Sequence, residues 1–161
     1  MTTGIDAVDG RLLALLHDEP RLSVLELARR AGVARGTAQA RLDRLQARGV
    51  VRGFGPEVDP AELGYPVLAF TTLEIVQAGV DGLVVHLASI PEVLEVHTIT
   101  GPGDLLCRIV ARSNDHLQDV IAAVLAGPSI NRASTHIALS TPVLHRTAPL
   151  VATAAAPPDE E

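Results

Sequence analysis

The sequence predicts an α+β protein of two domains, a small helical domain followed by a larger one that alternates strands with helices. Two observations lead to this prediction. In the first 60 residues, apolar side chains recur at helical spacing and glycines or prolines end each run. Beyond residue 60, four strand-favouring runs and two helical runs follow one another in the order β-α-β-β-α-β, which is the ferredoxin-like pattern.

The first predicted helix covers residues 7–17. Asp6 precedes it as an N-cap, and Leu12 and Leu15 lie on one apolar stripe that can pack on the helices that follow. Pro20 lies just beyond the end of this run, where it interrupts the helical pattern.

Two further helices are predicted on either side of a tight turn at Gly32. The first begins just after Ser23, which has the spacing of a capping box with Glu26. The second covers residues 35–48 and is followed by Gly49, the residue type favoured just after a helix. Two short helices joined in this way form a helix-turn-helix. The inner stripe of the second helix consists of Ala38, Leu42 and Leu45.

The helix-turn-helix region is strongly basic within an acidic chain. Residues 21–53 carry eight arginines and two acids, a formal charge of +6, whereas the whole chain has a net charge of −6. A basic island of this kind is typical of a surface that meets a polyanion. An α-helix fits the major groove of DNA, and arginine can contact phosphate or guanine. The alternative is an ordinary amphipathic helix with solvated arginines.

We therefore expect a DNA-binding face on residues 35–48. The side chains expected to approach bases or nearby phosphates are Arg35, Thr37, Gln39 and Arg41. Those expected to lean toward the DNA backbone are Arg44 and Arg48. Residues 50–55 favour β-structure, so we expect a wing or a strand there.

The domain boundary is predicted near residue 60, where the charge balance changes. Residues 1–60 carry nine arginines and eight acids, whereas residues 61–161 carry four arginines and eleven acids. The second domain is expected over residues 61–150, and the Ala/Pro-rich, then acidic, residues 151–161 are expected to be a disordered tail. The expected elements are strands over 65–76, 93–100, 105–111 and 130–143, a helix over 81–89, and a helix capped by Ser113 that runs to about residue 126.

The order and separation of several motifs resemble those of the Lrp/AsnC, or feast/famine, family of transcription regulators, over about residues 5–150. The resemblance implies a winged-helix-like DNA-binding domain joined to a ferredoxin-like domain of the RAM/ACT type. It also implies binding to double-stranded DNA and homodimers that assemble further, often to octamers. The motifs are Ile5-Asp6-x-x-Asp9-x-x-Leu12-Leu13, Arg21-Leu22-Ser23-x-x-Glu26-Leu27-Ala28, Arg41-Leu42-x-Arg44-Leu45, Gly49-Val50-Val51, Pro91-Glu92-Val93, Thr100-Gly101-x-Gly103-Asp104-Leu105-Leu106 and Thr135.

Two features depart from the family pattern. The family usually begins this helix with a serine cap and a proline, whereas Ala34, Arg35 and Gly36 occupy the turn here. An uncapped start lowers local stability by about 1 kcal/mol. Pro102 lies between two glycines in the loop after residue 100. In this family the loop is expected to line the pocket for a small-molecule effector, and the proline is expected to change the shape of that pocket.

The resemblance implies an effector, an amino acid or a related metabolite, bound between effector domains. Backbone N–H groups at the glycines can face a carboxylate, and an aspartate can receive an α-ammonium group. The alternative is a tight β-hairpin with an aspartate turn residue. The expected effector-binding residues are Thr100, Gly101, Gly103 and Asp104, with Thr135 and His136 contributed by a neighbouring subunit.

Other functional classes have weaker support in the sequence. Five of the six histidines follow residue 60, but neither an H-x-x-x-H pair nor a G-x-S-x-G motif occurs, so a metal-dependent enzyme is the less favoured alternative. A metabolite-binding module without DNA contact is a second alternative. We expect no catalytic residue, no metal site and no cofactor. Cys107 is the sole cysteine, and no membrane span or signal peptide is present, so we expect a cytoplasmic protein.

Overall fold

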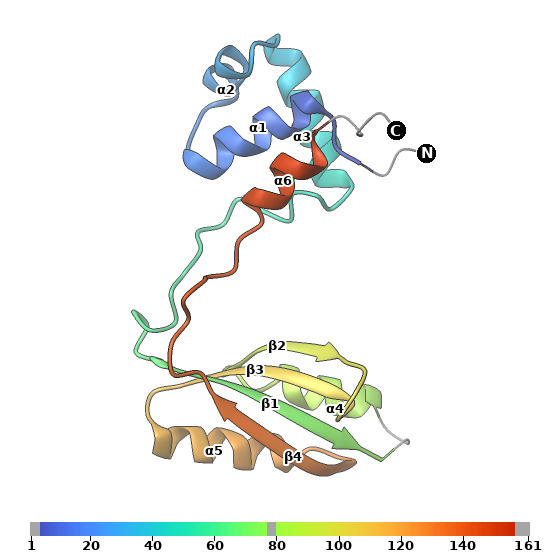
Figure 1. Ribbon diagram of the computed structural model, residues 1–161, viewed down its shortest axis with the longest axis vertical. Helices are drawn as coiled ribbons and strands as arrows, with labels where there is room; N and C mark the ends of the chain where they lie inside the picture. Colours follow the sequence, from blue (N-terminus) through green and yellow to red (C-terminus); the bar gives the residue numbers. More distant parts are fainter. Residues whose placement is uncertain (1–3, 77–79, 157–161) are drawn as a thin grey trace. The chain divides into compact units, whose positions relative to one another are not determined.

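The computed structural model describes residues 4–76 and 80–156, which form two compact units (Figure 1). The first, the helical unit, combines the N-terminal segment up to Pro56 with the C-terminal segment from Val143. The second, the sheet unit, is Glu57–Pro142. The change of unit lies close to the predicted boundary, but the return of the C-terminal segment to the helical unit was not predicted.

Three helices form the body of the helical unit: α1 (Ala7–Asp18), α2 (Val24–Ala31) and α3 (Arg35–Ala47). The predicted helix-turn-helix is therefore confirmed. The buried apolar side chains of α1 and α3, namely Leu12, Ala38, Leu42 and Leu45, belong to the stripes that helical spacing predicted. The buried core of the helical unit includes Leu12, Leu27, Ala28, Ala31, Ala38, Leu42 and Leu45.

The reciprocal capping box is at α1 and not at α2. The Asp6 carboxylate accepts from the Asp9 backbone N–H at 2.9 Å, and the Asp6 N–H donates to the Asp9 carboxylate at 3.3 Å. At α2 only half of the predicted box forms, because Ser23 accepts from the Glu26 N–H while the Glu26 carboxylate turns to Arg29. The arginines one turn later compete for this carboxylate, and sequence spacing gives no sign of that competition.

The ends of α3 follow the sequence closely. Ala34 provides no side-chain cap, as predicted, and Gly49 has a φ of +71°, the left-handed conformation that glycine adopts most easily. Residues 50–55 form no strand, so the predicted wing or strand there is wrong. A β-favouring composition is not enough when no neighbouring strand is available for pairing.

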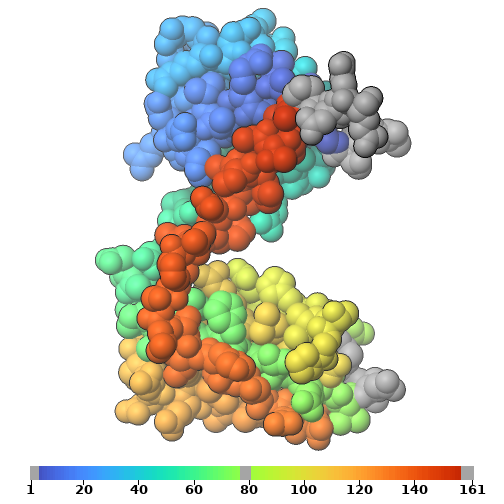
Figure 2. Space-filling view, in the orientation of Figure 1, coloured from blue at the N-terminus to red at the C-terminus, as the bar shows by residue number. Residues whose placement is uncertain are grey.

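The C-terminal segment forms an additional helix, α6 (Ala148–Ala154), which packs on α1 (Figures 1 and 2). The contact is close: a Cβ added to Gly10 of α1 would lie 2.3 Å from the Cβ of Ala155. The prediction of a disordered tail is therefore wrong for residues 151–156, and residues 157–161 lie outside the described part. Proline in the first turn and three alanines among the seven residues of α6 favour a helix, and packing on α1 stabilises it.

The sheet unit holds a four-stranded antiparallel sheet in the order β2-β3-β1-β4, which confirms the ferredoxin-like β-α-β-β-α-β topology. Strand β4 ends six residues earlier than its predicted limit of 143. Pro142 and the return of the chain to the helical unit explain the early end. The strands are β1 (Val67–Ile75), β2 (Val93–Thr98), β3 (Leu105–Ala111) and β4 (Ile130–Ile137).

One face of this sheet is covered by α4 (Val80–Ala88) and α5 (Asn114–Leu125), and α5 begins at the predicted cap, Ser113. Alternate residues of β1 point toward the helices, and Phe70 lies on the opposite face with 37% of its surface exposed. Among residues 4–76 and 80–156, no helix is long and apolar enough to cross a membrane. The core of the sheet unit includes Ala69, Leu73, Leu83, Leu87, Leu105, Cys107, Ile109, Leu117, Val120 and Val124.

Candidate functional site

The outer side of α3 forms a continuous exposed ridge, which we call the outward ridge. It consists of Gly36, Ala40, Asp43 and Ala47, all exposed and spaced four, three and four residues apart. The opposite side of the helix is buried in the core. A second helix of a helix-turn-helix that is buried on one side and open on the other has the geometry needed to enter the major groove.

Three of the predicted DNA-binding residues lie exposed in the first half of α3: Arg35, Thr37 and Gln39. Within the described part of the chain, the Arg35 side chain makes no ion pair or hydrogen bond, so its guanidinium group is available to a phosphate or a base. The Gln39 side-chain amide donates to the Asp43 carboxylate at 2.7 Å. Asp43 was not among the predicted site residues, although its spacing from Gln39 is the usual one for a side-chain pair on a helix.

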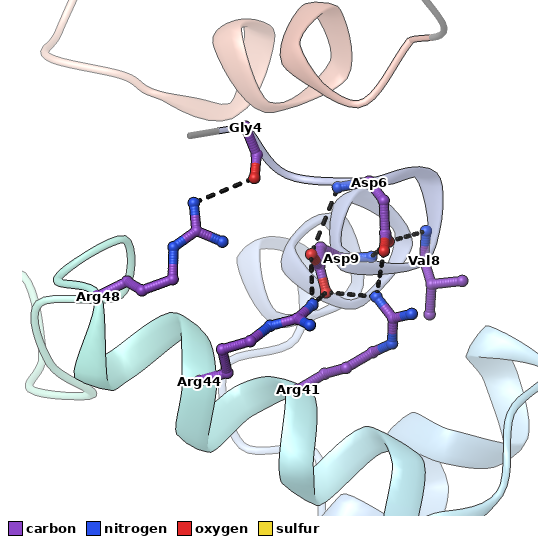
Figure 3. A network of polar contacts seen from close by, with 7 residues as sticks. All are labelled: Gly4, Asp6, Val8, Asp9, Arg41, Arg44 and Arg48. Atoms are coloured by element: carbon purple, nitrogen blue, oxygen red, sulfur yellow. Dashed lines mark hydrogen bonds and ion pairs between the residues drawn. The ribbon is translucent and has the colours of Figure 1, made fainter. Parts of the chain in front are cut away.

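Arg41 and Arg44 lie on another side of α3 and point toward the start of α1 (Figure 3). Arg41 donates to Asp6 at 2.5 Å and to Asp9 at 2.8 Å. Arg44 donates to the other oxygen of Asp9 at 3.1 Å. Two arginines and two aspartates therefore form a compact cluster that has no net charge, and we call it the Asp9 network.

The Asp9 network is largely shielded from solvent at its centre. Asp9 is only 1% exposed, and the side chains of Arg41 and Arg44 are 23% and 50% exposed. The hydrogen bond from Arg41 lowers the pKa of Asp6 from its ordinary 3.8 to about 2. A lowered pKa means that the carboxylate stabilises the folded state above about pH 4, and this contribution is lost as the pH falls toward 2.

Arg41, Arg44 and Arg48 all make contacts within the protein that were not predicted from the sequence. The first two have carboxylate partners within the protein, and Arg48 donates to the backbone carbonyl of Gly4 at 3.0 Å (Figure 3). The acids that neutralise Arg41 and Arg44 lie outside residues 21–53, so the charge of that segment alone overstates what it offers to a polyanion. The spacing of Asp6 and Asp9, three residues apart at a helix start, was the available signal.

Other arginines of the helical unit are also paired. Glu26 holds Arg29 at 2.7 Å and Arg30 at 2.8 Å, and Arg30 also pairs with Glu19. Within the described residues of this unit, the arginines whose side chains make no ion pair or hydrogen bond are Arg21, Arg35, Arg52 and Arg146.

In the sheet unit, the predicted effector loop is held at the end of β1 by Asp104. Its carboxylate accepts from the Ile75 N–H at 2.8 Å, and its backbone N–H donates to the Leu73 carbonyl, also at 2.8 Å. The side chain is exposed, so one carboxylate oxygen has a structural role while the group still faces solvent. Asp104 therefore has a structural role in the loop, and its part in effector binding stays a prediction.

The two glycines of this loop have different surroundings. Both have positive φ angles, +112° at Gly101 and +108° at Gly103. Around Gly101 the space is open, whereas a Cβ at Gly103 would lie 2.2 Å from the Thr72 methyl group. Gly103 is therefore required by packing, and Gly101, with Thr100 beside it, remains on the exposed side of the loop.

Thr135 and His136 are successive residues of β4, so their side chains point to opposite faces of the sheet. Thr135 faces the helices, and its hydroxyl lies 2.9 Å from that of buried Thr71. His136 is exposed on the other face, opposite Phe70 of β1. A pocket on one face of the sheet can therefore contact only one of these two side chains.

The two histidines and the cysteine considered for a metal site or an enzyme lie on three different strands of the sheet. His97 lies on β2 and His136 on β4, which are the two edge strands of the sheet, so no shared metal site joins them. His97 contacts Glu95 at 3.1 Å. Burial raises the pKa of Cys107 to about 11, so its thiol stays protonated and unreactive. Among the described residues, no group of three His, Cys, Asp or Glu side chains is placed to hold a metal ion.

Both units match families of known proteins. Residues 5–52 match the winged helix-turn-helix DNA-binding family, and residues 68–148 match the Lrp/AsnC ligand binding domain. Over 128 residues the chain is 30% identical to the HTH-type transcriptional regulator AldR of Mycolicibacterium smegmatis, covering 78% of this chain and 75% of that protein.

Solved structures give the same result. AsnC of E. coli aligns with a TM-score of 0.81 and 29% identity, covering 90% of this chain and 99% of AsnC. The feast or famine regulatory protein of M. tuberculosis, solved in complex with L-methionine, aligns with a TM-score of 0.79 and 27% identity, covering 88% of this chain and 96% of that one. A helix-turn-helix with an open outer side, joined to a ligand-binding domain of this type, places the chain in the Lrp/AsnC family of DNA-binding transcriptional regulators.

Proposed function

We propose that this regulator reads DNA with the first half of α3. Arg35, Thr37 and Gln39 contact bases or the nearest phosphates, and the outward ridge faces the floor of the major groove. The observation that carries the proposal is that Arg35 is exposed beside this ridge and has no partner among residues 4–76 and 80–156, whereas Arg41 is paired with Asp6 and Asp9. Arg44 and Arg48 lie farther along the helix, where they flank the DNA backbone.

We expect Arg35→Ala and Arg41→Ala to differ in their effect on DNA binding. Replacing Arg35 removes a cation that displaces counterions from DNA, so the slope of log K against log salt should fall by about 0.9. Replacing Arg41 should leave that slope unchanged, because its charge is already neutralised within the protein. Fluorescence anisotropy on a labelled duplex over a range of salt concentrations measures both slopes.

The two variants also differ in their expected stability. Arg41→Ala should lower the melting temperature of the helical unit, because it breaks the ion pairs with Asp6 and Asp9. Arg35→Ala should leave it unchanged, because the Arg35 side chain makes no ion pair or hydrogen bond with any residue that the structure describes. An equal loss of slope in both variants would show that Arg41 leaves Asp9 and binds phosphate in the complex. Unchanged slopes in both would reject this face of α3 as the DNA-binding surface.

We also propose that the loop around Asp104 binds the α-ammonium group of an amino-acid effector, with the exposed backbone at Gly101 beside it. Support comes from the exposed carboxylate of Asp104 and from the M. tuberculosis relative, which was solved with L-methionine. Effector binding at a subunit interface would shift the balance between arrangements of the DNA-binding units. The sheet face that carries Phe70 is the proposed dimer surface, because no helix of the sheet unit covers it in the described chain.

We expect millimolar L-methionine to raise the melting temperature of the sheet unit and Asp104→Asn to abolish this shift. Asparagine keeps an oxygen that can accept from the Ile75 N–H, but it lacks the charge that attracts an ammonium group. Differential scanning fluorimetry across the amino acids measures the effect. A melting-temperature shift that persists in Asp104→Asn would mean that the ammonium group binds elsewhere. A shift produced only by another amino acid would identify a different effector for the same site.

A symmetric dimer, or a larger assembly such as an octamer, would present its DNA-binding helices in pairs. Each pair would read half-sites separated by about one turn of DNA, 34–36 Å. Since the proposed partner is chromosomal DNA, the expected location is the cytoplasm.

A further inference from the structure

The outward ridge of α3 carries a negative charge where it would be expected to meet DNA. Asp43 is the sole acid of the helix Arg35–Ala47, and it is exposed. A carboxylate facing phosphate groups weakens binding to every DNA sequence by like-charge repulsion. An acid in this position therefore needs a favourable partner, and base edges in the major groove offer one, since cytosine N4 and adenine N6 are amino groups that can donate to it.

The hydrogen bond to Gln39 determines how the two side chains are presented. A carboxylate can only accept, so the Gln39 amide must turn its nitrogen toward Asp43, and the distance is 2.7 Å. The Gln39 carbonyl oxygen and the second oxygen of Asp43 are then left for a ligand. These two side chains then offer two acceptor oxygens and the second N–H of the Gln39 amide, so their acceptors outnumber their donors and favour a base that presents an amino group.

The neighbours on the ridge allow this pair to reach a base edge. Gly36 and Ala40 come before Asp43 on the ridge, Ala47 comes after it, and all three are small and exposed. Because these residues do not hold the helix away from the groove, a short aspartate can reach the floor. Arg21, which makes no ion pair among the described residues, lines the same groove of the surface as Gln39 and Asp43. Its positive charge would offset the repulsion between Asp43 and a phosphate bound beside the groove.

We infer that Gln39 and Asp43 act as one base-reading pair that selects a base with an exocyclic amine, cytosine through N4 or adenine through N6, at one position of the binding site. The inference rests on the proposed function, since it requires α3 to lie in the major groove. The two bases correspond to two geometries. Cytosine would donate directly to Asp43, whereas adenine would pair with Gln39, which Asp43 would hold in orientation.

The test is selection of binding sites from a library of randomised DNA duplexes by the full chain, followed by sequencing. At one position, wild-type protein should favour adenine or cytosine over guanine or thymine by roughly ten- to a hundredfold. Asp43→Asn replaces one acceptor with a donor, so the preference should relax at that position and persist at the others. Affinity for random DNA should rise in this variant, because a negative charge has been removed.

Asp18→Asn is the matched control, because it removes the same charge from the exposed end of α1 without touching α3. It should leave every base preference unchanged. Gln39→Ala separates the two geometries: it abolishes an adenine preference but leaves much of a cytosine preference, because Asp43 is still present.

Recovery of a clear site whose base preferences are the same in Asp43→Asn would overturn the base-reading pair and leave DNA binding by α3 intact. A preference for guanine or thymine at every position that responds to Asp43 would overturn it as well. Failure of the wild-type protein to enrich any sequence would instead reject the proposed function, and the inference with it.

Discussion

Replacing Asp9 with asparagine is expected to lower the free energy of unfolding of the helical unit by about 2–3 kcal/mol. Asp9 is 1% exposed and receives hydrogen bonds from both Arg41 and Arg44. Removal of one partner from a fully buried ion pair costs about 3–5 kcal/mol, because the other charge is left without compensation. The lower figure applies here because both guanidinium groups are partly exposed and Asp6 still binds Arg41.

Hydrogen exchange followed by mass spectrometry is the suitable measurement, since it reports on the amides of α1 and α3 separately from the sheet unit. Asp18→Asn, on the same helix but exposed, should change protection by less than about 0.5 kcal/mol. Protection in Asp9→Asn equal to that of the control would mean that the network adds nothing to stability. A loss confined to the first turn of α1 would indicate a capping effect alone.

The Asp9 network shows where inference from sequence ends for this protein. Helical spacing predicted the buried stripe of α3 and placed Arg41 and Arg44 on a shared flank. It could not show which flank meets α1, because the partners lie 32 and 35 residues away along the chain. Periodicity describes one helix at a time, whereas the partner of a charge depends on how two helices pack.

The fold of the sheet unit was easier to predict, except for the path of the chain after β4. Alternating and continuous apolar runs predicted four strands and two helices, and the known topology for that order supplied the sheet. The helix α6 was missed because alanine and proline were taken as signs of disorder. Its stability comes from contact with α1 at Gly10, which local composition does not reveal.

Among single substitutions in the sheet unit, Gly103→Ala is expected to have a particularly large effect, a loss of about 3 kcal/mol. Positive φ costs an L-residue about 1–2 kcal/mol. The remainder comes from overpacking, because the added Cβ would lie 2.2 Å from the Thr72 methyl group and 3.3 Å from the Leu73 carbonyl oxygen. Tyr65 is the sole tyrosine and no tryptophan is present, so intrinsic fluorescence during urea unfolding reports on the sheet unit.

The neighbouring glycine and Thr72 allow the two causes to be separated. Gly101→Ala has a similar φ but open space, so it should lose about 1–2 kcal/mol. Thr72→Ser removes the methyl group that the new Cβ would meet, and in that background Gly103→Ala should lose about as much as Gly101→Ala. Equal losses for Gly103→Ala in both backgrounds would show that the Leu73 carbonyl, which no side-chain change can move, sets the limit. Because Asp104 binds Leu73 and Ile75 through its backbone and side chain, the loop that carries the proposed effector site would then be fixed by the backbone of β1 itself.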